Sequence, residues 1–152
     1  MRVTFFKLVE DRCSYWEAVR GKRTKVPGTP MALGRGGMPH DLLQMLVEGA
    51  VGFEDGFWGS VAAGATFKST GRKRTKPGRA VIAQNREGID RAEHIVGEHL
   101  HRWARGKPTP CAEVLDSYAE RWEALDDREG FTLEWPSLTF LETVERTTSP
   151  IR

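Results

Sequence analysis

Hydrophobic spacing changes from that of strands to that of helices near residue 38 of this chain, and the change sets the class of fold that it can adopt. Residues 3–19 carry β-branched and aromatic side chains on both alternating sets of positions, which is typical of strands. The polar break Glu10-Asp11-Arg12 divides this stretch, so an N-terminal antiparallel hairpin is predicted. After Met38 the apolar residues recur every three or four positions, which is the spacing of helices.

About four helices and one further strand are predicted after the hairpin. Pro39 and Asp41 suit the first turn of a helix that Gly52 ends, and Thr109-Pro110 suits the start of another. The predicted helices span 39–52, 56–67, 85–105 and 109–125, the strand spans 131–135, and loops span 21–37 and 71–78. The predicted buried faces of the last two helices are Ile89, Ala92, Val96, Leu100 and Trp103, and Cys111, Leu115, Tyr118, Trp122 and Leu125.

Together these elements predict one α+β domain over residues 1–148, in which the hairpin packs against the helices, followed by a frayed C-terminus at 149–152. No apolar run approaches the roughly 20 residues of a membrane helix, and the N-terminus lacks the apolar stretch of a signal peptide. We therefore expect a cytoplasmic protein without a membrane partner. Cys13 and Cys111 are expected to be buried, reduced thiols.

Charge is arranged in blocks, although the net charge is only +2. Residues 1–38 carry 8 basic and 3 acidic side chains, and residues 68–107 carry 11 and 4. The two other blocks are acidic: residues 39–67 carry 4 acidic and no basic side chains, and residues 108–152 carry 10 and 4. Opposite blocks can face each other in the fold, or the basic blocks can converge on a polyanion.

The first candidate site is the start of the helix at 39–52. His40 lies at the amino end of this helix beside Asp41. Glu48 follows about two turns after Asp41 on the same face, and Gln44 lies between Asp41 and Glu48. Imidazole and carboxylate groups together can exchange protons or bind a divalent metal, so His40, Asp41 and Glu48 are candidate catalytic residues. The structural alternative is that Asp41 favours the helix start while Glu48 is solvated on a polar face.

The second candidate is the polar face of the helix at 85–105. Asp90, His94 and Glu98 follow one another at intervals of four, and His101 comes three residues later. His94 or His101 can join His40 and Glu48 as metal ligands between two helices. The alternative is a solvated face of mixed charges, and His99 is expected to be partly buried and hydrogen-bonded.

The third candidate is basic and lies on two loops whose sequences resemble each other. Cations that neutralise phosphates release counterions, so such a cluster favours binding of a polyanion, nucleic acid included. Neither loop carries the aromatic residues of a single-strand binding platform. The alternative is an ordinary solvated loop. The candidate residues are Lys22, Arg23, Lys25, Arg72, Lys73, Arg74, Lys76 and Arg79.

The segment Pro39-His40-Asp41-Leu42, with Val47-Glu48 and Gly56-Phe57-Trp58-Gly59 after it, resembles a family of small actinobacterial proteins without an established activity. The likeness covers about a fifth of the chain, residues 38–67. Members often carry a second histidine where this chain has Gln44, so a metal site carried over from the family would lack one ligand here. The resemblance implies a compact bacterial cytosolic domain, but no substrate or cofactor.

Two classes of function remain open from the sequence. The first is a non-enzymatic binding or accessory protein whose block-charged surface holds a protein or a polyanion, with no cofactor. The second is a metal-dependent or acid–base enzyme, similar to a hydrolase, centred on His40, Asp41 and Glu48 with a divalent metal as cofactor. The first is favoured because no complete catalytic set is readable.

Overall fold

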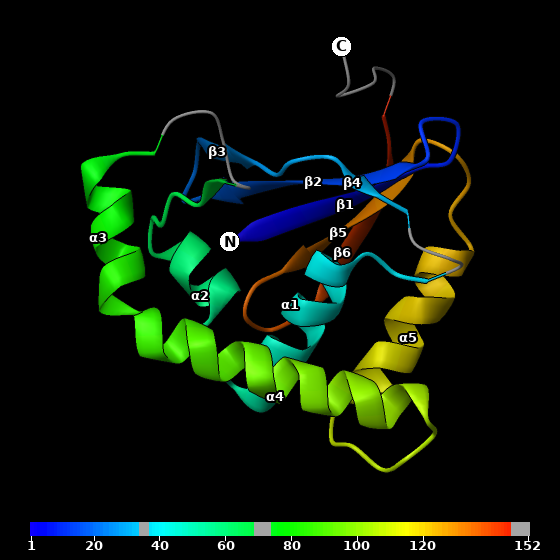
Figure 1. The fold of residues 1–152 in the computed structure, drawn as a ribbon. Coiled ribbons are helices and arrows are strands. Elements are labelled where there is room, and N and C mark those ends of the chain that lie inside the picture. The colour runs from blue at the N-terminus through cyan, green and yellow to red at the C-terminus, as the bar shows by residue number, and fades with distance from the viewer. Residues whose placement is uncertain (34–36, 69–73, 147–152) are drawn as a thin grey trace.

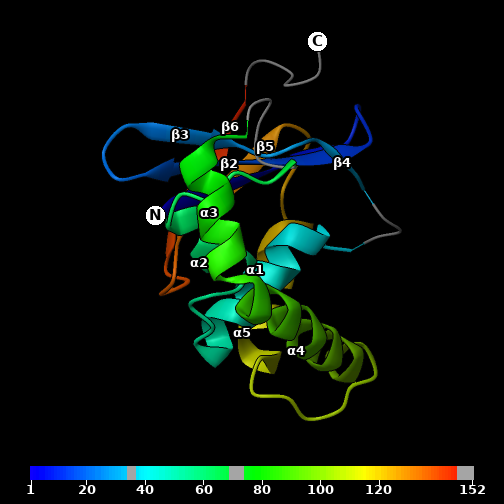
Figure 2. The same cartoon turned by 60° about the vertical axis from the view of Figure 1, so that its left-hand side comes forward.

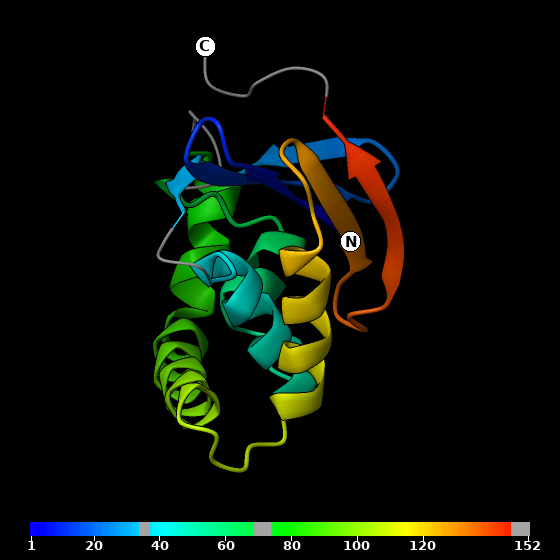
Figure 3. The same ribbon diagram turned by 90° about the vertical axis from the view of Figure 1, so that its right-hand side faces the viewer.

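Within the residues that the structure describes, a six-stranded antiparallel sheet forms one layer and five helices lie on one side of it, which confirms the predicted α+β class (Figure 1). The structure is a computed structural model that describes residues 1–33, 37–68 and 74–146. Figure 2 and Figure 3 show the same two layers from the sides, with the helices on the same side of the sheet in each view. Among the described residues, none of the helices combines the length and the apolar character of a membrane-spanning segment.

The predicted N-terminal hairpin is present and forms the centre of the sheet. Its strands pair antiparallel with Phe5 opposite Trp16. The sheet order is β3-β2-β1-β5-β6, with β4 also paired to β2. The strands are β1 (Arg2–Leu8), β2 (Cys13–Arg20), β3 (Thr24–Pro27), β4 (Met31–Ala32), β5 (Glu129–Glu134) and β6 (Phe140–Glu145).

Two strands correct the prediction of a loop at 21–37, and a third lies where none was predicted. β3 and β4 are only four and two residues long, and both pair with β2. β6 pairs with β5, whose prediction at 131–135 is confirmed with a shift of one or two residues. Short edge strands owe their conformation to a neighbouring strand, so their own residues carry little periodic signal.

The helices are α1 (His40–Val51), α2 (Phe57–Ala62), α3 (Lys76–Gln84), α4 (Arg86–Ala104) and α5 (Ala112–Glu123). α1 follows Pro39 and ends at Gly52, whose φ of 76° is the left-handed conformation that glycine adopts readily. α2 is shorter than predicted, and α5 begins two residues after Pro110 rather than at it.

α3 corrects the predicted loop at 71–78, of which residues 71–73 lie outside the described residues. Thr75 accepts a hydrogen bond from the backbone N–H of Gly78 at 3.0 Å, which is the geometry of an N-cap. Pro77 lies in the first turn, where its missing N–H removes no helical bond. Thr75, with Pro77 two residues after it, therefore marks the start of this helix within a basic segment.

The core lies between the sheet and the helices. Trp58 of α2 is fully buried and packs against Phe5 and Trp16, with ring centroids 5.8 and 4.7 Å away. The predicted face of α5 is confirmed as buried, and on α4 Ala92 and Val96 are buried while Ile89, Leu100 and Trp103 are partly buried. Cys13 and Cys111 are buried free thiols, as predicted.

Candidate functional site

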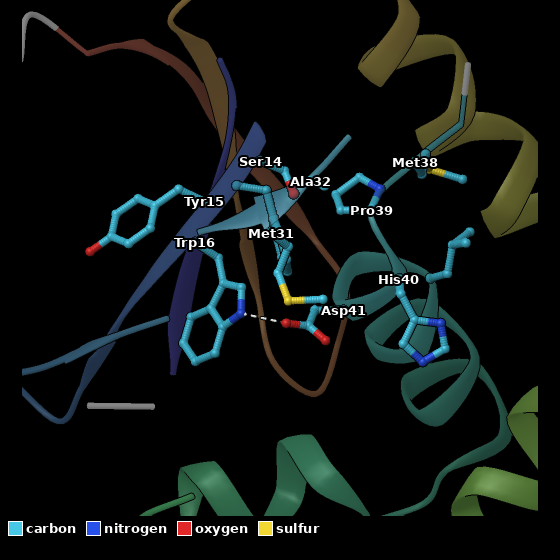
Figure 4. A pocket seen from close by; sticks show the side chains of 11 residues that line it. Ser14, Tyr15, Trp16, Met31, Ala32, Met38, Pro39, His40 and Asp41 are labelled. Carbon is cyan, nitrogen blue, oxygen red and sulfur yellow. Dashed lines mark hydrogen bonds between the residues drawn. The ribbon is translucent and has the colours of Figure 1, made fainter. Parts of the chain in front are cut away.

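A pocket of about 260 Å³ lies between the start of α1 and the strands β2 and β4. Figure 4 shows that Trp16 comes from the sheet, Met31 from β4, and His40 and Asp41 from the first turn of α1. The carboxylate of Asp41 points toward Trp16, whereas the His40 ring lies on the side of α1 away from that carboxylate. The two neighbouring residues therefore serve different parts of the pocket.

Asp41 joins three elements through hydrogen bonds. Its Oδ2 accepts from the indole Nε1–H of Trp16 at 2.9 Å, and its backbone carbonyl accepts from the indole Nε1–H of Trp58 at 2.9 Å. A buried indole N–H needs an acceptor, because leaving it unpaired costs about 1–3 kcal/mol. Asp41 thus has a structural reason to be acidic and close to the helix start, in addition to any role in the pocket.

Glu48 and Gln44 correct the prediction that this face of the helix is solvated, because Glu48 is 0% exposed and Gln44 8%. Glu48 Oε2 accepts from Gln44 Nε2 at 2.8 Å and from the backbone N–H of Phe57 at 3.2 Å. Its Oε1 accepts from the backbone N–H of Trp58 at 3.1 Å. These two N–H groups open α2, which has no side-chain cap of its own, so Glu48 caps α2 from another helix.

Gly56 makes room for this carboxylate. A Cβ added there would lie 2.4 Å from Glu48 Oε1, which is closer than two such atoms can approach. The motif Gly56-Phe57-Trp58 thereby supplies the space and two backbone donors that Glu48 uses. Much of the segment that resembles the actinobacterial family is explained by this contact between α1 and α2.

Burial raises the pKa of Glu48 from 4.5 to about 7. Desolvation is the largest cause, and the hydrogen bonds from Gln44, Trp58 and Phe57 oppose it. Asp55 adds a smaller rise in pKa through charge repulsion. A carboxyl group with this pKa exchanges its proton near neutral pH, although the side chain is closed off from solvent.

This raised pKa predicts that the protein loses stability as pH rises from about 4.5 to about 7. In that range the unfolded chain has released the Glu48 proton and the folded chain has kept it, so the slope of the unfolding free energy against pH is negative. The contribution amounts to about 3 kcal/mol over the range. Urea unfolding of the wild type and of Glu48→Gln at several pH values measures it as the difference between the two curves. Parallel curves would contradict it.

The candidate metal ligands are not gathered in one place. Among the residues that the structure describes, no three His, Cys, Asp or Glu side chains lie close enough to hold a metal ion. His40, His94 and His101 are exposed, while Glu48 is buried against α2. His99 is partly buried and its Nδ1 lies 2.7 Å from Thr109 Oγ1, which confirms the prediction made for it.

Neither cysteine has the surroundings of an activated nucleophile. Burial raises the pKa of the Cys13 thiol, and the charge of Asp11 raises it further. Burial also raises the pKa of the Cys111 thiol, against an opposing hydrogen bond from Thr109. A raised pKa keeps a thiol protonated and therefore unreactive. Cys111 packs in the core between sheet and helices, and Cys13 packs in a smaller cluster with Phe6, Leu8 and Tyr15.

The described basic candidates are all exposed, and they lie at one end of the molecule. The β2–β3 turn and the amino end of α3 lie at the same end in Figure 1 and Figure 2. None of these side chains forms a hydrogen bond or ion pair with another described residue. We call this set the basic end: Lys22, Arg23, Lys25, Arg74, Lys76 and Arg79. Arg72 and Lys73 lie outside the described residues.

Hydrogen bonds tie both basic segments to one short stretch of chain, residues 61–66. Arg20, directly before the β2–β3 turn, donates from Nη1 to the carbonyl of Val61 at 3.0 Å. Thr66 Oγ1 accepts from the backbone N–H of Thr75 at 3.1 Å, where α3 begins. Val61 and Thr66 are only five residues apart, so the chain between them spans at most about 18 Å. The two segments are therefore held near each other although about 50 residues separate them.

Trp16 and Ser14 line the pocket but were not among the predicted site residues. Their signal lies in the alternation of β2, which places both on the same face as Ala18, toward the helices. A tryptophan on a buried face needs an acceptor for its indole N–H, and this need is the signal that the sequence carries. The partner itself is 25 residues away and has no local signature.

No protein-family model, no curated protein and no solved structure matches this chain. The resemblance of residues 38–67 to the actinobacterial family therefore stays an expectation. A function can be inferred from the geometry and the charges of the described residues.

Proposed function

We propose that this chain is a non-enzymatic binding protein that holds a polyanion, such as a nucleic acid, at its basic end. The observation that carries the proposal is the convergence of two separate basic segments on one end of the molecule (Figures 1 and 2). Convergence of this kind concentrates positive potential where a single loop would not.

The local charge supports the proposal. Residues 18–26 and 74–86 together contain no aspartate or glutamate, so no neighbour in either segment neutralises the basic side chains. Lysine and arginine on exposed turns and helix starts suit contact with the phosphates of a polymer, since each contact releases counterions. The described aromatic side chains of the core are buried, so contact with the backbone of a polyanion is favoured over stacking on its bases.

The position of the acidic candidates supports a non-enzymatic role. Both oxygens of Glu48 and one of Asp41 already accept hydrogen bonds from the protein. The His40 ring is directed away from Asp41, and Glu48 is closed off from solvent. A general acid–base pair needs a carboxyl group that reaches a substrate, and neither residue offers one beside His40.

Binding of a fluorescently labelled duplex DNA, a single-stranded RNA and heparin tests the proposal by anisotropy at several salt concentrations. We expect log K to fall linearly with log salt, with a slope of about −5 if the six side chains of the basic end meet phosphates. The double variant Lys22→Gln/Arg23→Gln should reduce that slope by about 2 and weaken binding to every sequence alike.

The matched control is Arg105→Gln/Lys107→Gln, which removes two exposed charges just after the carboxyl end of α4, far from α3 and β3 in Figure 1. The affinity of this control should stay within about two-fold of the wild-type affinity. Its slope of log K against log salt should differ from the wild-type slope by no more than about 0.5. Equal effects of both double variants would show a general response to net charge and would reject the basic end as the site. Absence of binding to all three polyanions at low salt would reject the proposal.

A further inference from the structure

The pocket at the start of α1 carries a carboxylate without a cation. Asp41 is half-buried, one of its oxygens accepts from Trp16, and no Lys, Arg or His of the described residues forms an ion pair with it. The surrounding block of residues 39–67 has four acidic and no basic side chains. An unpaired negative charge in a partly enclosed site attracts a cation more strongly than the same charge on an open surface.

A second polar group faces the same pocket without a partner. Ser14 is only 4% exposed and lines the pocket from β2, and its hydroxyl makes no hydrogen bond with any described residue. No fully enclosed side-chain oxygen or nitrogen of the described residues lacks a partner, so the Ser14 hydroxyl keeps access to the pocket space. Serine hydroxyls in such places are normally satisfied, and here a ligand can provide the missing hydrogen bond.

The rest of the pocket wall is apolar. Phe5 and Met38 are buried, Leu43 is partly buried, and Met31 is 43% exposed. Methionine side chains adapt to the shape of a bound group. At about 260 Å³ the space lies just below the range of pockets for drug-sized ligands, so it suits a small molecule.

From these groups we infer that the pocket binds a small organic cation, namely a primary amine on an apolar body. The ammonium group pairs with the free oxygen of Asp41. The apolar body packs against Met31 and the other apolar side chains of the wall. This site is opposite in charge to the basic end, so it serves a different ligand from the proposed polyanion and does not depend on it.

Isothermal titration of the full chain with three probes of nearly equal shape tests the charge preference. The probes are 2-phenylethylamine, the neutral 2-phenylethanol and the anionic 3-phenylpropanoate. We expect the amine to bind at least about 10-fold more tightly than the alcohol, because a hydrogen bond to a charged group adds about that much affinity, and the anion to bind most weakly. Equal binding of amine and alcohol, or a preference for the anion, would overturn the inference.

Variants assign the preference to the proposed groups. Asp41→Asn keeps an acceptor for the Trp16 indole but removes the charge, and it should abolish the preference for the amine over the alcohol. Ser14→Ala, which removes a hydroxyl drawn apart from Asp41 in Figure 4, should leave the ratio of amine to alcohol affinity unchanged. Glu54→Gln removes an exposed charge from the same acidic block and should leave all three affinities unchanged. Retention of the amine preference in Asp41→Asn would reject the site.

The polyanion-deficient variant Lys22→Gln/Arg23→Gln separates the two proposals. It should bind 2-phenylethylamine with wild-type affinity, whereas Asp41→Asn should bind the labelled polyanions as the wild type does. Loss of amine binding in the basic-end variant would contradict the placement of the amine at Asp41.

Discussion

Replacing Glu48 by alanine should destabilise the protein by about 3–5 kcal/mol, which is a large part of the stability of a domain of this size. The change removes the acceptors of the Phe57 and Trp58 N–H groups, and it leaves the buried Gln44 amide without its partner. It also leaves a cavity where a fully buried side chain stood. Urea unfolding followed by far-UV circular dichroism measures the loss, and a midpoint close to that of the wild type would contradict it.

Two control variants test whether the loss of stability comes from the buried carboxyl group of Glu48 or from replacing any glutamate on a helix. Glu48→Gln keeps the shape and one acceptor oxygen, so it should lose less than half as much stability as the alanine variant. Glu98→Ala removes an exposed glutamate from α4 and should change stability by no more than about 0.5 kcal/mol. Equal losses in Glu48→Ala and Glu98→Ala would mean that the cap of α2 contributes little.

The second large effect is expected from Gly59→Ala in α2. A Cβ at this position would lie 1.7 Å from the backbone carbonyl oxygen of Glu54, so the two segments must move apart. A backbone carbonyl cannot avoid the clash by changing rotamer, as a side chain can. The change should therefore destabilise the protein by more than about 3 kcal/mol. Thermal unfolding measures the effect as a lower midpoint.

Gly97→Ala in α4 is the matched control. It is the same substitution within a helix, but a Cβ there would meet no atom within 4 Å. Alanine should therefore stabilise α4 by about 0.5–1 kcal/mol, since it loses less conformational entropy than glycine on folding. The two variants should move the unfolding midpoint in opposite directions, and a shift of the same sign in both would contradict the close approach at Gly59.

The residues of the His40–Glu48 segment divide into those that the fold requires and one that it does not. Asp41 accepts hydrogen bonds from two tryptophans, and Glu48 caps α2. His40 is exposed and lines the pocket at the start of α1, and no hydrogen bond to another described residue involves its ring. The acidic residues thus hold α1, α2 and β2 together, and the His40 ring is the part of this segment that the fold does not require.

Periodicity along the chain was sufficient to predict the hairpin, α1, α4 and most of α5 within a few residues. Each of these elements carries its own repeating apolar face, and a repeat of this kind depends only on residues nearby in the sequence. The block charges can also be counted directly along the chain, and for that reason the basic candidates are readable from the sequence.

Other features depend on contacts between distant residues. β3 and β4 are too short to show a period, and their conformation comes from pairing with β2. The helical spacing of Glu48 places it on the polar side of α1, yet α2 folds back over that side and offers two N–H donors. The sequence of one helix predicts that a polar side chain is solvated, because it does not show which other element will cover that side chain.

The candidate site shows the same division. His40 and Asp41 are adjacent in sequence, so their place at the start of α1 followed from the helix signals alone. The pocket forms where β2 brings Trp16 and Ser14 against that helix start, and the basic end forms where two hydrogen bonds tie the β2–β3 turn and the start of α3 to residues 61–66. Local spacing decides which helices and strands form. The burial of a polar side chain and the clustering of distant charges depend on surfaces that meet only when the chain has folded.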